Sequence, residues 1–195
     1  MTQEDKWFDK VGYFSEGFAR IRIEGKGWNF INKQCELLWK GDKCFNKVNN
    51  FHWGFASVYT RRKGWNFINT NGELVWKEDK WFDKVSDFYN GFASVKKAGK
   101  YNFINEQGEL LWEEYKKFDK VDIFAYDYAR VYKKGRGYNY INPQGELLWK
   151  EDKWFDEADY LFWALPSVKY KGNWYKLKDN GELTTNLFFY TLHTN

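Results

Sequence analysis

Residues 64–76 read Gly-Trp-Asn-Phe-Ile-Asn-Thr-Asn-Gly-Glu-Leu-Val-Trp, and residues 27–39 repeat most of this pattern. Looser copies begin at Lys100, Gly137 and Asn173. The aromatic residues at the second position of the copies are separated by 37, 36, 37 and 36 residues. A fixed period of this length indicates tandem structural repeats. The sequence therefore predicts a single repeat domain over residues 1–195, with copies at about 7–43, 44–80, 81–116, 117–153 and 154–195.

Each copy has the residue pattern of an antiparallel β-meander. In the second copy, residues 54–60 alternate along a predicted strand, with Ala56 and Val58 on one face. Residues 65–69 and 73–77 are the second and third predicted strands. The Asn-Gly pair between these two strands favours a type I′ hairpin turn. No stretch shows helical periodicity of useful length, so the predicted fold class is all-β.

The second and third predicted strands are apolar on both faces, which a single meander cannot bury. We therefore expect the five meanders to pack on one another as one continuous structure. An open twisted array and a closed five-bladed, propeller-like ring would both satisfy this requirement. The fifth copy carries polar Lys176 and Thr185 where other copies carry aromatic residues, as a capping repeat does. The open array is therefore the favoured prediction.

The composition of the chain indicates a folded protein. Aromatic residues make up 23% of the chain, and disordered chains lack such a content of aromatic side chains. No apolar run approaches the ~18 residues that a membrane helix needs, and no secretory signal pattern opens the sequence. The two cysteines, Cys35 and Cys44, are too few for a disulfide framework. We therefore expect a cytoplasmic protein that does not bind membranes.

Three segments carry a resemblance to a known family: residues 51–58 (Phe-x-x-Gly-Phe-Ala-Ser-Val), residues 64–69 and residues 82–88 (Phe-Asp-Lys-Val-x-x-Phe). With these motifs the chain resembles the WG-repeat, or KWG-repeat, family of bacterial β-repeat proteins. It departs from the family pattern at the residue after the anchor aromatic, which is Asn29, Asn66, Asn102 or Asn139 instead of glycine. The resemblance implies a β-repeat architecture without a common enzymatic activity, and a fold of this kind does not by itself specify a function.

The recurrent acidic residues are the main candidates for catalysis. They form two sets, which are Glu36, Glu73, Glu109, Glu146 and Glu182, and Asp9, Asp83, Asp119 and Asp156. A hydrolase with paired carboxylates is one interpretation. The favoured interpretation is structural, because each Glu follows a turn and each Asp is placed to accept local backbone hydrogen bonds. His52 and His193 stand outside any nucleophile or metal-binding motif. The sequence predicts no enzyme, no metal and no cofactor.

Two sets of turns are candidates for binding a partner. Basic turns follow the first predicted strand of several copies, and their residues are Arg61, Arg62, Lys63, Lys96, Lys97, Lys133, Lys134 and Arg136. In a regular stack they would form a stripe that could contact nucleic acid or an acidic protein. Lysine-rich turns are also common for solubility alone. The Phe-x-x-Gly turns vary between copies and expose aromatic anchors suited to a protein interface, at Trp53, Tyr89, Tyr126 and Trp163.

A ladder of tryptophans is the third candidate surface, formed by Trp39, Trp76, Trp112 and Trp149. Burial in the core is the favoured interpretation of this Trp ladder. The sequence as a whole predicts a non-catalytic protein that binds another protein, as an adaptor or a stoichiometric inhibitor. Nucleic-acid binding through the basic turns is the first alternative, and it predicts affinity that falls steeply with salt. Glycan binding by an exposed Trp ladder is the second alternative.

Overall fold

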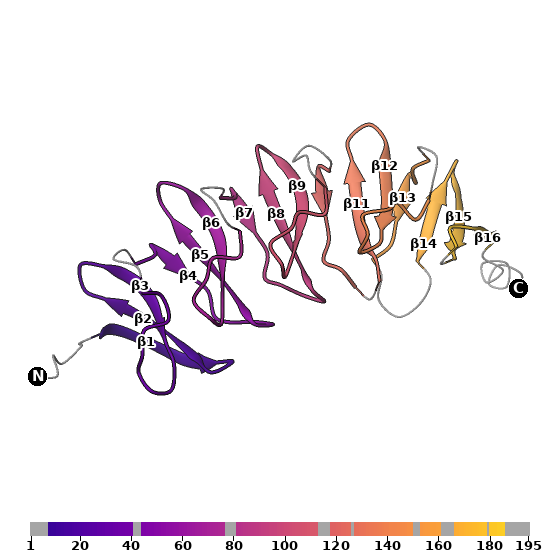
Figure 1. Cartoon of the computed structure of the whole chain (residues 1–195). Coiled ribbons are helices and arrows are strands. Elements are labelled where there is room, and N and C mark those ends of the chain that lie inside the picture. The colour runs from indigo at the N-terminus through magenta and orange to yellow at the C-terminus, as the bar shows by residue number, and fades with distance from the viewer. Residues whose placement is uncertain are drawn as a thin grey trace, which may run out of the picture. The chain divides into compact units, whose positions relative to one another are not determined.

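The computed structural model describes residues 8–40, 44–76, 81–112, 118–125, 127–149, 153–160, 166–178 and 180–185 of the chain. Within these residues every regular element is a β-strand, and no helix occurs (Figure 1). The strands form five antiparallel sheets, one per repeat, and no closed barrel. The predicted all-β fold of tandem antiparallel meanders is therefore confirmed. No helix in the described part of the chain is long and apolar enough to cross a membrane.

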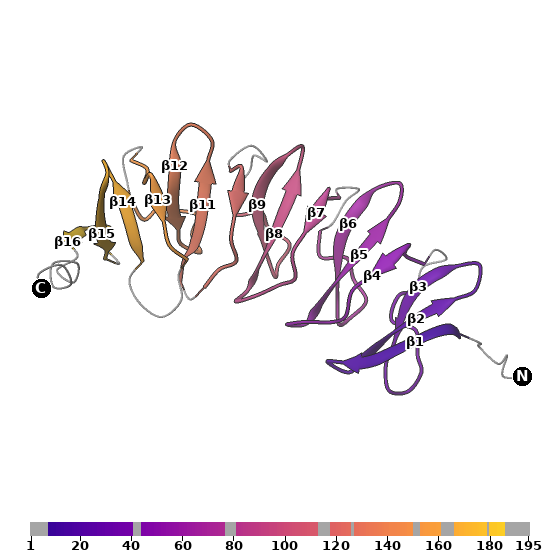
Figure 2. The same ribbon diagram turned by 180° about the vertical axis from the view of Figure 1, so that it is seen from behind.

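Each of the first four repeats forms one three-stranded sheet whose strands follow in chain order (Figure 1, Figure 2). The strands of the first two sheets are β1 (Phe8–Ser15), β2 (Phe18–Ile23), β3 (Gly27–Ile31), β4 (Lys47–Val48), β5 (Phe55–Thr60) and β6 (Gly64–Asn69). Those of the next two are β7 (Lys84–Val85), β8 (Phe92–Lys97), β9 (Lys100–Asn105), β10 (Lys120–Val121), β11 (Ala129–Lys133) and β12 (Gly137–Ile141). The fifth sheet has four strands, β13 (Glu157–Ala158), β14 (Ser167–Tyr170), β15 (Asn173–Leu177) and β16 (Leu183–Thr185).

The prediction of a third strand in the second repeat is wrong. Residues 73–76 pair with the sheet through an isolated bridge between Ile68 and Leu74 and do not form a strand. The reason lies in the buried side chain of Asn66. Its amide nitrogen donates to the carbonyl of Trp76 at 3.0 Å, and its oxygen accepts from the backbone N–H of Trp76 at 3.2 Å. The Asn66 side chain thus forms hydrogen bonds with both the backbone N–H and the carbonyl of Trp76, and we call this arrangement the Asn clamp.

The Asn clamp recurs in the four repeats that carry this asparagine, at Asn29, Asn66, Asn102 and Asn139. In the fifth repeat the position is Tyr175, which pairs through its backbone with Thr185 in a regular ladder. Among the described residues, a fourth strand forms in this repeat alone. The departure from the glycine of the WG pattern therefore has a structural role, because the asparagine replaces strand pairing in each repeat where it occurs.

The type I′ turns lie at the Phe-x-x-Gly motifs and not at the Asn-Gly pair, where only Gly72 has a positive φ. Both central residues of a type I′ turn have positive φ. At the Phe-x-x-Gly motifs, Glu16, Trp53 and Asn90 have φ of 50°, 55° and 48°, and the glycine that follows each is also positive. The segment around Gly72 instead folds over the side chain of Asn69, which accepts the backbone N–H groups of Asn71 and Glu73.

The chain divides into two compact units, and the prediction of one domain with five equal copies stays a prediction. Unit 1 comprises Met1–Lys97 with Ile104–Leu110, and unit 2 comprises Ala98–Phe103 with Leu111–Asn195. In unit 1 the phenylalanines of the second and third Phe-x-x-Gly turns insert against the preceding repeat. Phe51 lies 4.7 Å from Phe18 between ring centroids, and Phe88 lies 4.3 Å from Phe55. Both inserted rings are buried.

Glycine allows the repeats of unit 1 to approach closely. A Cβ at Gly72 would lie 2.5 Å from the carbonyl oxygen of Leu38, and one at Gly108 would lie 2.2 Å from that of Val75. Both contacts join a turn to the backbone of the preceding repeat. In the first repeat the same turn position is Cys35, which has a φ of 61° and is exposed. The glycine is therefore a requirement of stacking between repeats.

Unit 2 contains the same kind of core. Its buried residues include Tyr140, Phe155, Val168 and Leu177. The hydroxyl of Tyr140 donates to the backbone carbonyl of Asp159 at 2.6 Å. The corresponding positions in the other repeats are Phe30, Phe67 and Phe103. Tyr140 is therefore the one core ring of this set that also makes a hydrogen bond into the following repeat.

Candidate functional site

The recurrent glutamates take part in turn structure. Asn69 donates to the carboxylate of Glu73 at 3.0 Å while its side-chain oxygen accepts the backbone N–H of the same residue at 2.9 Å. The first, third and fourth repeats make the same pair. In the fifth repeat Lys178 replaces the asparagine and forms an ion pair with Glu182 at 3.0 Å. These carboxylates are therefore held by partners of their own turn.

Two of the recurrent aspartates, Asp119 and Asp156, accept backbone hydrogen bonds from the basic turns, as predicted. The carboxylate of Asp119 accepts the N–H of Lys134 at 2.8 Å, and Asp156 accepts that of Gly172 at 3.3 Å. Asn46 replaces the aspartate in the second repeat and accepts the N–H of Arg61 at 2.8 Å. The hydrogen bond from Lys100 and that from the Lys134 backbone lower the pKa of Asp119. The carboxylate is therefore held in the ionised form.

No group of three or more metal-binding side chains occurs among the described residues. Burial raises the pKa of the Cys44 thiol, which lowers its thiolate fraction and with it its reactivity as a nucleophile.

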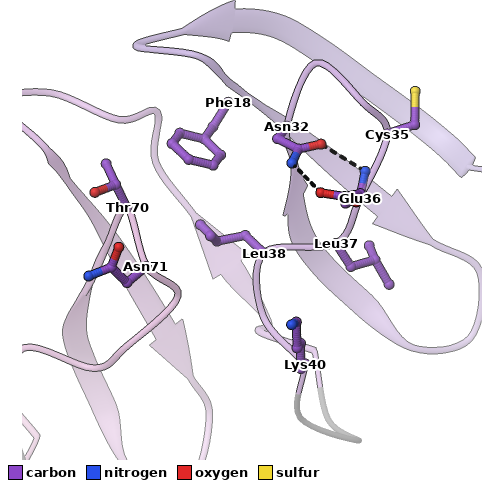
Figure 3. Close-up of a pocket in the computed structure, with 9 residues that line it drawn as sticks. All are labelled: Phe18, Asn32, Cys35, Glu36, Leu37, Leu38, Lys40, Thr70 and Asn71. Atoms are coloured by element: carbon purple, nitrogen blue, oxygen red, sulfur yellow. Dashed lines mark hydrogen bonds between the residues drawn. The ribbon is translucent and has the colours of Figure 1, made fainter.

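The larger cavity, of about 740 Å³, lies in unit 1 between the first two repeats (Figure 3). Phe18 and Leu38 point into it, and Cys35 points away. The cavity is also lined by the carboxylate residue Glu36, which is hydrogen-bonded to the Asn32 side chain through both its own side chain and its backbone N–H. The cavity is lined by polar side chains, among them Lys40, Thr70 and Asn71, as well as by apolar ones, and its Glu36 carboxylate is held by Asn32.

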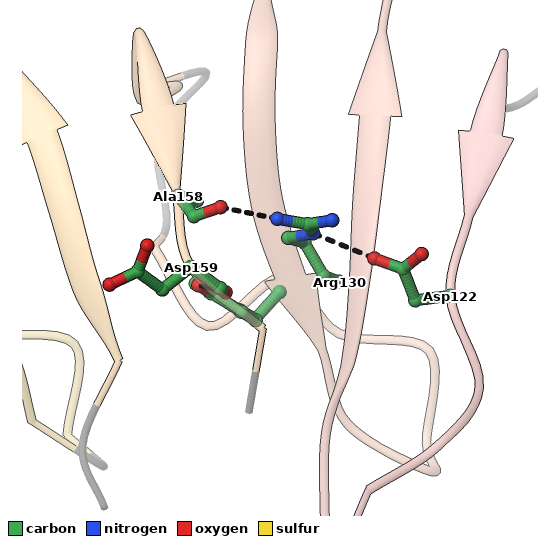
Figure 4. Close-up of polar contacts among 5 residues, drawn as sticks. Asp122, Arg130, Ala158 and Asp159 are labelled. Carbon is green, nitrogen blue, oxygen red and sulfur yellow. Dashed lines mark hydrogen bonds and ion pairs between the residues drawn. The ribbon is translucent and has the colours of Figure 1, made fainter. Parts of the chain in front are cut away.

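A second cavity, of about 150 Å³, lies in unit 2 around Arg130. The guanidinium donates to Asp122 at 2.7 Å and to the carbonyl of Ala158 (Figure 4). Its carbon also lies 3.7 Å from the ring centroid of Tyr160. Because these contacts come from both the fourth and fifth repeats, the Arg130 side chain links the two repeats.

The predicted basic residues lie in both units, so their alignment in one stripe stays a prediction. In unit 1, Arg61, Arg62 and Lys63 are exposed in the turn between β5 and β6. Lys96 and Lys97 are half-buried at the end of β8, and the Lys97 ammonium donates to the carbonyl of Trp81. In unit 2, Lys133 is half-buried, while Lys134 and Arg136 are exposed in the turn after β11. Several basic side chains of this set thus have partners within the chain.

Each tryptophan of the Trp ladder packs against a phenylalanine at the start of the following repeat. Trp76 is 8% exposed and stacks on Phe82 with ring centroids 4.1 Å apart, and Trp149 stacks on Phe155 at 4.2 Å. Trp39 and Trp112 are half-buried and also lie against a phenylalanine. The predicted core role of these indoles therefore agrees with their packing.

The Phe-x-x-Gly turns expose aromatic side chains where the sequence predicts them. Trp53 is 50% exposed and Tyr89 is 40% exposed, and their rings meet edge to face with centroids 5.9 Å apart. Tyr126 and Trp163, the other two predicted anchors, lie outside the described residues. The two described anchors come from successive repeats and form one surface.

Sequence reasoning missed two residues of this surface, Glu16 and Tyr13. The carboxylate of Glu16 accepts the backbone N–H groups of Trp53 and Gly54, each at 2.7 Å. The Tyr13 hydroxyl accepts from the side-chain amide of Asn50 at 2.7 Å. Glu16 stands in the same repeat position as Trp53, one period earlier, which is the signal that could have identified it.

The fold and these surfaces define a β-repeat protein whose repeat-specific side chains gather on its turns. The chain is similar to the WG-repeat family: the model described as WG containing repeat matches residues 8–26 and residues 82–101. No curated protein matches the chain in sequence. The resemblance inferred from the motifs is thus confirmed.

The chain is also similar to several solved structures. The computationally designed Ika8 protein is 12% identical with a TM-score of 0.43, over 84% of this chain and 56% of that chain. The designed Ika4 protein is 12% identical with a TM-score of 0.40, over 73% and 99%. BamB from Moraxella catarrhalis is 12% identical with a TM-score of 0.39, over 90% and 62%. The match thus spans less than two thirds of the Ika8 and BamB chains.

Proposed function

We propose that this chain is a non-catalytic protein that binds another protein, as an adaptor or a stoichiometric inhibitor. The observation that carries the proposal is Trp53, which is half exposed at a position where φ is 55°. Bulky residues rarely adopt this conformation, and the turn type prefers asparagine, aspartate or glycine. An exposed indole on a residue with an unfavourable backbone conformation is typical of an interface anchor.

The roles of the acidic residues support a non-catalytic function. A paired-carboxylate hydrolase needs one carboxylate as a nucleophile or base and a second one as an acid. The described members of the glutamate set instead hold their own turns, and Asp119 and Asp156 bind the backbone of the basic turns. We therefore assign these carboxylates to the stability of the repeats.

The exposed basic turn of the second repeat favours nucleic acid as a second candidate partner. Arg61 and Arg62 stand at the tip of the turn between β5 and β6, where a phosphate backbone could reach them. Such binding would weaken steeply with salt because it releases counterions. The Trp ladder gives less support to glycan binding, because its indoles pack against phenylalanines of the chain.

Affinity capture from a lysate of the source cells tests the proposal. The tagged full chain is incubated with and without nuclease, washed at low and high salt, and the retained proteins are identified by mass spectrometry. The proposal predicts a discrete protein that stays bound after nuclease treatment and a high-salt wash. Recovery that disappears with nuclease or salt would replace it with nucleic-acid binding.

A further inference from the structure

One edge of unit 1 exposes aromatic side chains from three successive repeats. Tyr13 is 71% exposed, and Trp53 and Tyr89 are also solvent-exposed. Contacts join the three turns, since Asn50 of the second repeat binds Tyr13 of the first, and the Trp53 ring meets that of Tyr89 in the third. These aromatic residues together with Glu16 and Asp87 form a surface that we call the aromatic–acidic strip.

The three segments that form the strip contain no Lys or Arg of their own, and the half-buried Arg20 beside them donates to the carbonyl of Val48. Residues 11–19, 48–60 and 85–95 contain no Lys or Arg, although 31 of the 195 residues in the chain are Lys or Arg. The two acidic residues of the strip are both exposed. The basic-turn residues of the second and third repeats stand at the other ends of β5 and β8, roughly 20 Å away at ~3.3 Å per residue. Each of these strands therefore separates an aromatic turn from a basic one, and Asp87 precedes the aromatic turn before β8.

The backbone under Trp53 is held in place before any partner binds. The Glu16 carboxylate takes the N–H groups of Trp53 and Gly54, which fixes the turn that carries the indole. A fixed anchor loses little conformational entropy on binding. Tryptophan is also the side chain whose ring face attracts cations most strongly, and exposed carboxylates next to it add attraction of the same sign.

We infer that the aromatic–acidic strip binds a basic, extended segment of a partner protein, with Lys or Arg side chains over the aromatic rings and near the carboxylates. This inference rests on the proposed protein-binding function and names the surface and the chemistry of the partner. The whole chain has a net charge of +4, so it repels cationic peptides in general. Binding of such a peptide therefore reports a local site and not the overall charge.

Fluorescence anisotropy with labelled peptides tests this inference on the full chain. One peptide alternates Arg and Gly, and a matched peptide alternates Glu and Gly. We expect the Arg peptide to bind at least about tenfold more tightly than the Glu peptide, because the strip is aromatic and acidic. Trp53→Asn should weaken the Arg peptide about fivefold, and Asp87→Asn should weaken it about threefold.

Two features keep the test specific. Trp53→Asn introduces the residue that Asn90 supplies at the same turn position, so the variant is expected to fold. Trp174→Thr removes a tryptophan of similar exposure outside the strip and should leave the affinity unchanged. Equal binding of the two peptides, or an unchanged affinity in Trp53→Asn, would overturn the inference. If wild type and Trp53→Asn nevertheless retain the same cellular protein, the proposed function stands and the partner uses another surface.

Discussion

Trp53 combines an unfavourable backbone conformation with an exposed side chain. Replacing it by asparagine relieves the strain of a bulky residue at φ of 55°, because asparagine tolerates this region. We expect Trp53→Asn to raise the free energy of unfolding by about 1 kcal/mol. Urea denaturation followed by circular dichroism measures the difference. The reciprocal change, Asn90→Trp, should lower stability, and a stabilised Asn90→Trp chain would argue against strain at this position.

The buried clamp of Asn66 makes a larger contribution to stability than the exposed turn of Asn69. Asn66→Ala leaves the backbone N–H and carbonyl of Trp76 without the amide that binds both. We expect this change to lower the free energy of unfolding by about 3 kcal/mol. Asn69→Ala removes hydrogen bonds at a partly solvated turn and should cost about 1 kcal/mol. Equal losses in urea denaturation would show that the clamp is not a special feature of the repeat.

Tyr140 gives unit 2 a pH-dependent contribution to stability. Burial raises the pKa of its hydroxyl well above its ordinary value of about 10. Above pH ~10 the unfolded chain loses this proton while the folded chain keeps it, so stability falls as the pH rises. Tyr140→Phe should make the decline between about pH 9 and pH 11 shallower. An identical decline in both proteins, measured by urea denaturation across this range, would rule out the contribution.

Stacking between elements depends on glycines that a β-repeat pattern alone does not distinguish. Gly108 and Gly91 both have φ of 81°, but a Cβ at Gly108 would meet the carbonyl oxygen of Val75, while Gly91 has open space around it. Both alanine variants therefore carry backbone strain of about 1 kcal/mol. Gly108→Ala should cost roughly 2 kcal/mol more, because the turn must move away from the preceding repeat. Similar losses for the two variants in chemical denaturation would contradict the close approach.

At the scale of elements, the sequence predicts what depends on local pattern. The period and the alternation of apolar residues predict one antiparallel sheet per repeat, and the sheets are found. The third strand was predicted wrongly because the backbone of Trp76 binds the side chain of Asn66, ten residues earlier. The alternation of apolar residues along the sequence gives no sign of a hydrogen bond between a side chain and a backbone group ten residues away. The type I′ turn was also assigned to Asn71-Gly72, since local turn preferences do not reveal that Asn69 organises this segment.

At the scale of the molecule, chain period and residue type identified part of the candidate site. Trp53 and Tyr89 could be predicted because they vary within a recurring turn. Glu16 shares the repeat position of Trp53, but its contact with the Trp53 turn, like that of Tyr13 with Asn50, joins residues one repeat apart and becomes visible only when the repeats are stacked. The separation of basic turns from aromatic turns is present in the sequence. Its significance appears only when the two kinds of turn are placed at opposite ends of the same strands.

The central claim is that the protein binds another protein through the Phe-x-x-Gly turns. Quantitative affinity capture with wild type, Trp53→Asn and Trp174→Thr, each treated with nuclease and washed at high salt, tests this claim most directly. The account predicts that a discrete protein is retained by wild type and by Trp174→Thr and is depleted about fivefold or more with Trp53→Asn. Equal retention by all three proteins, or no retained protein at all, would contradict it.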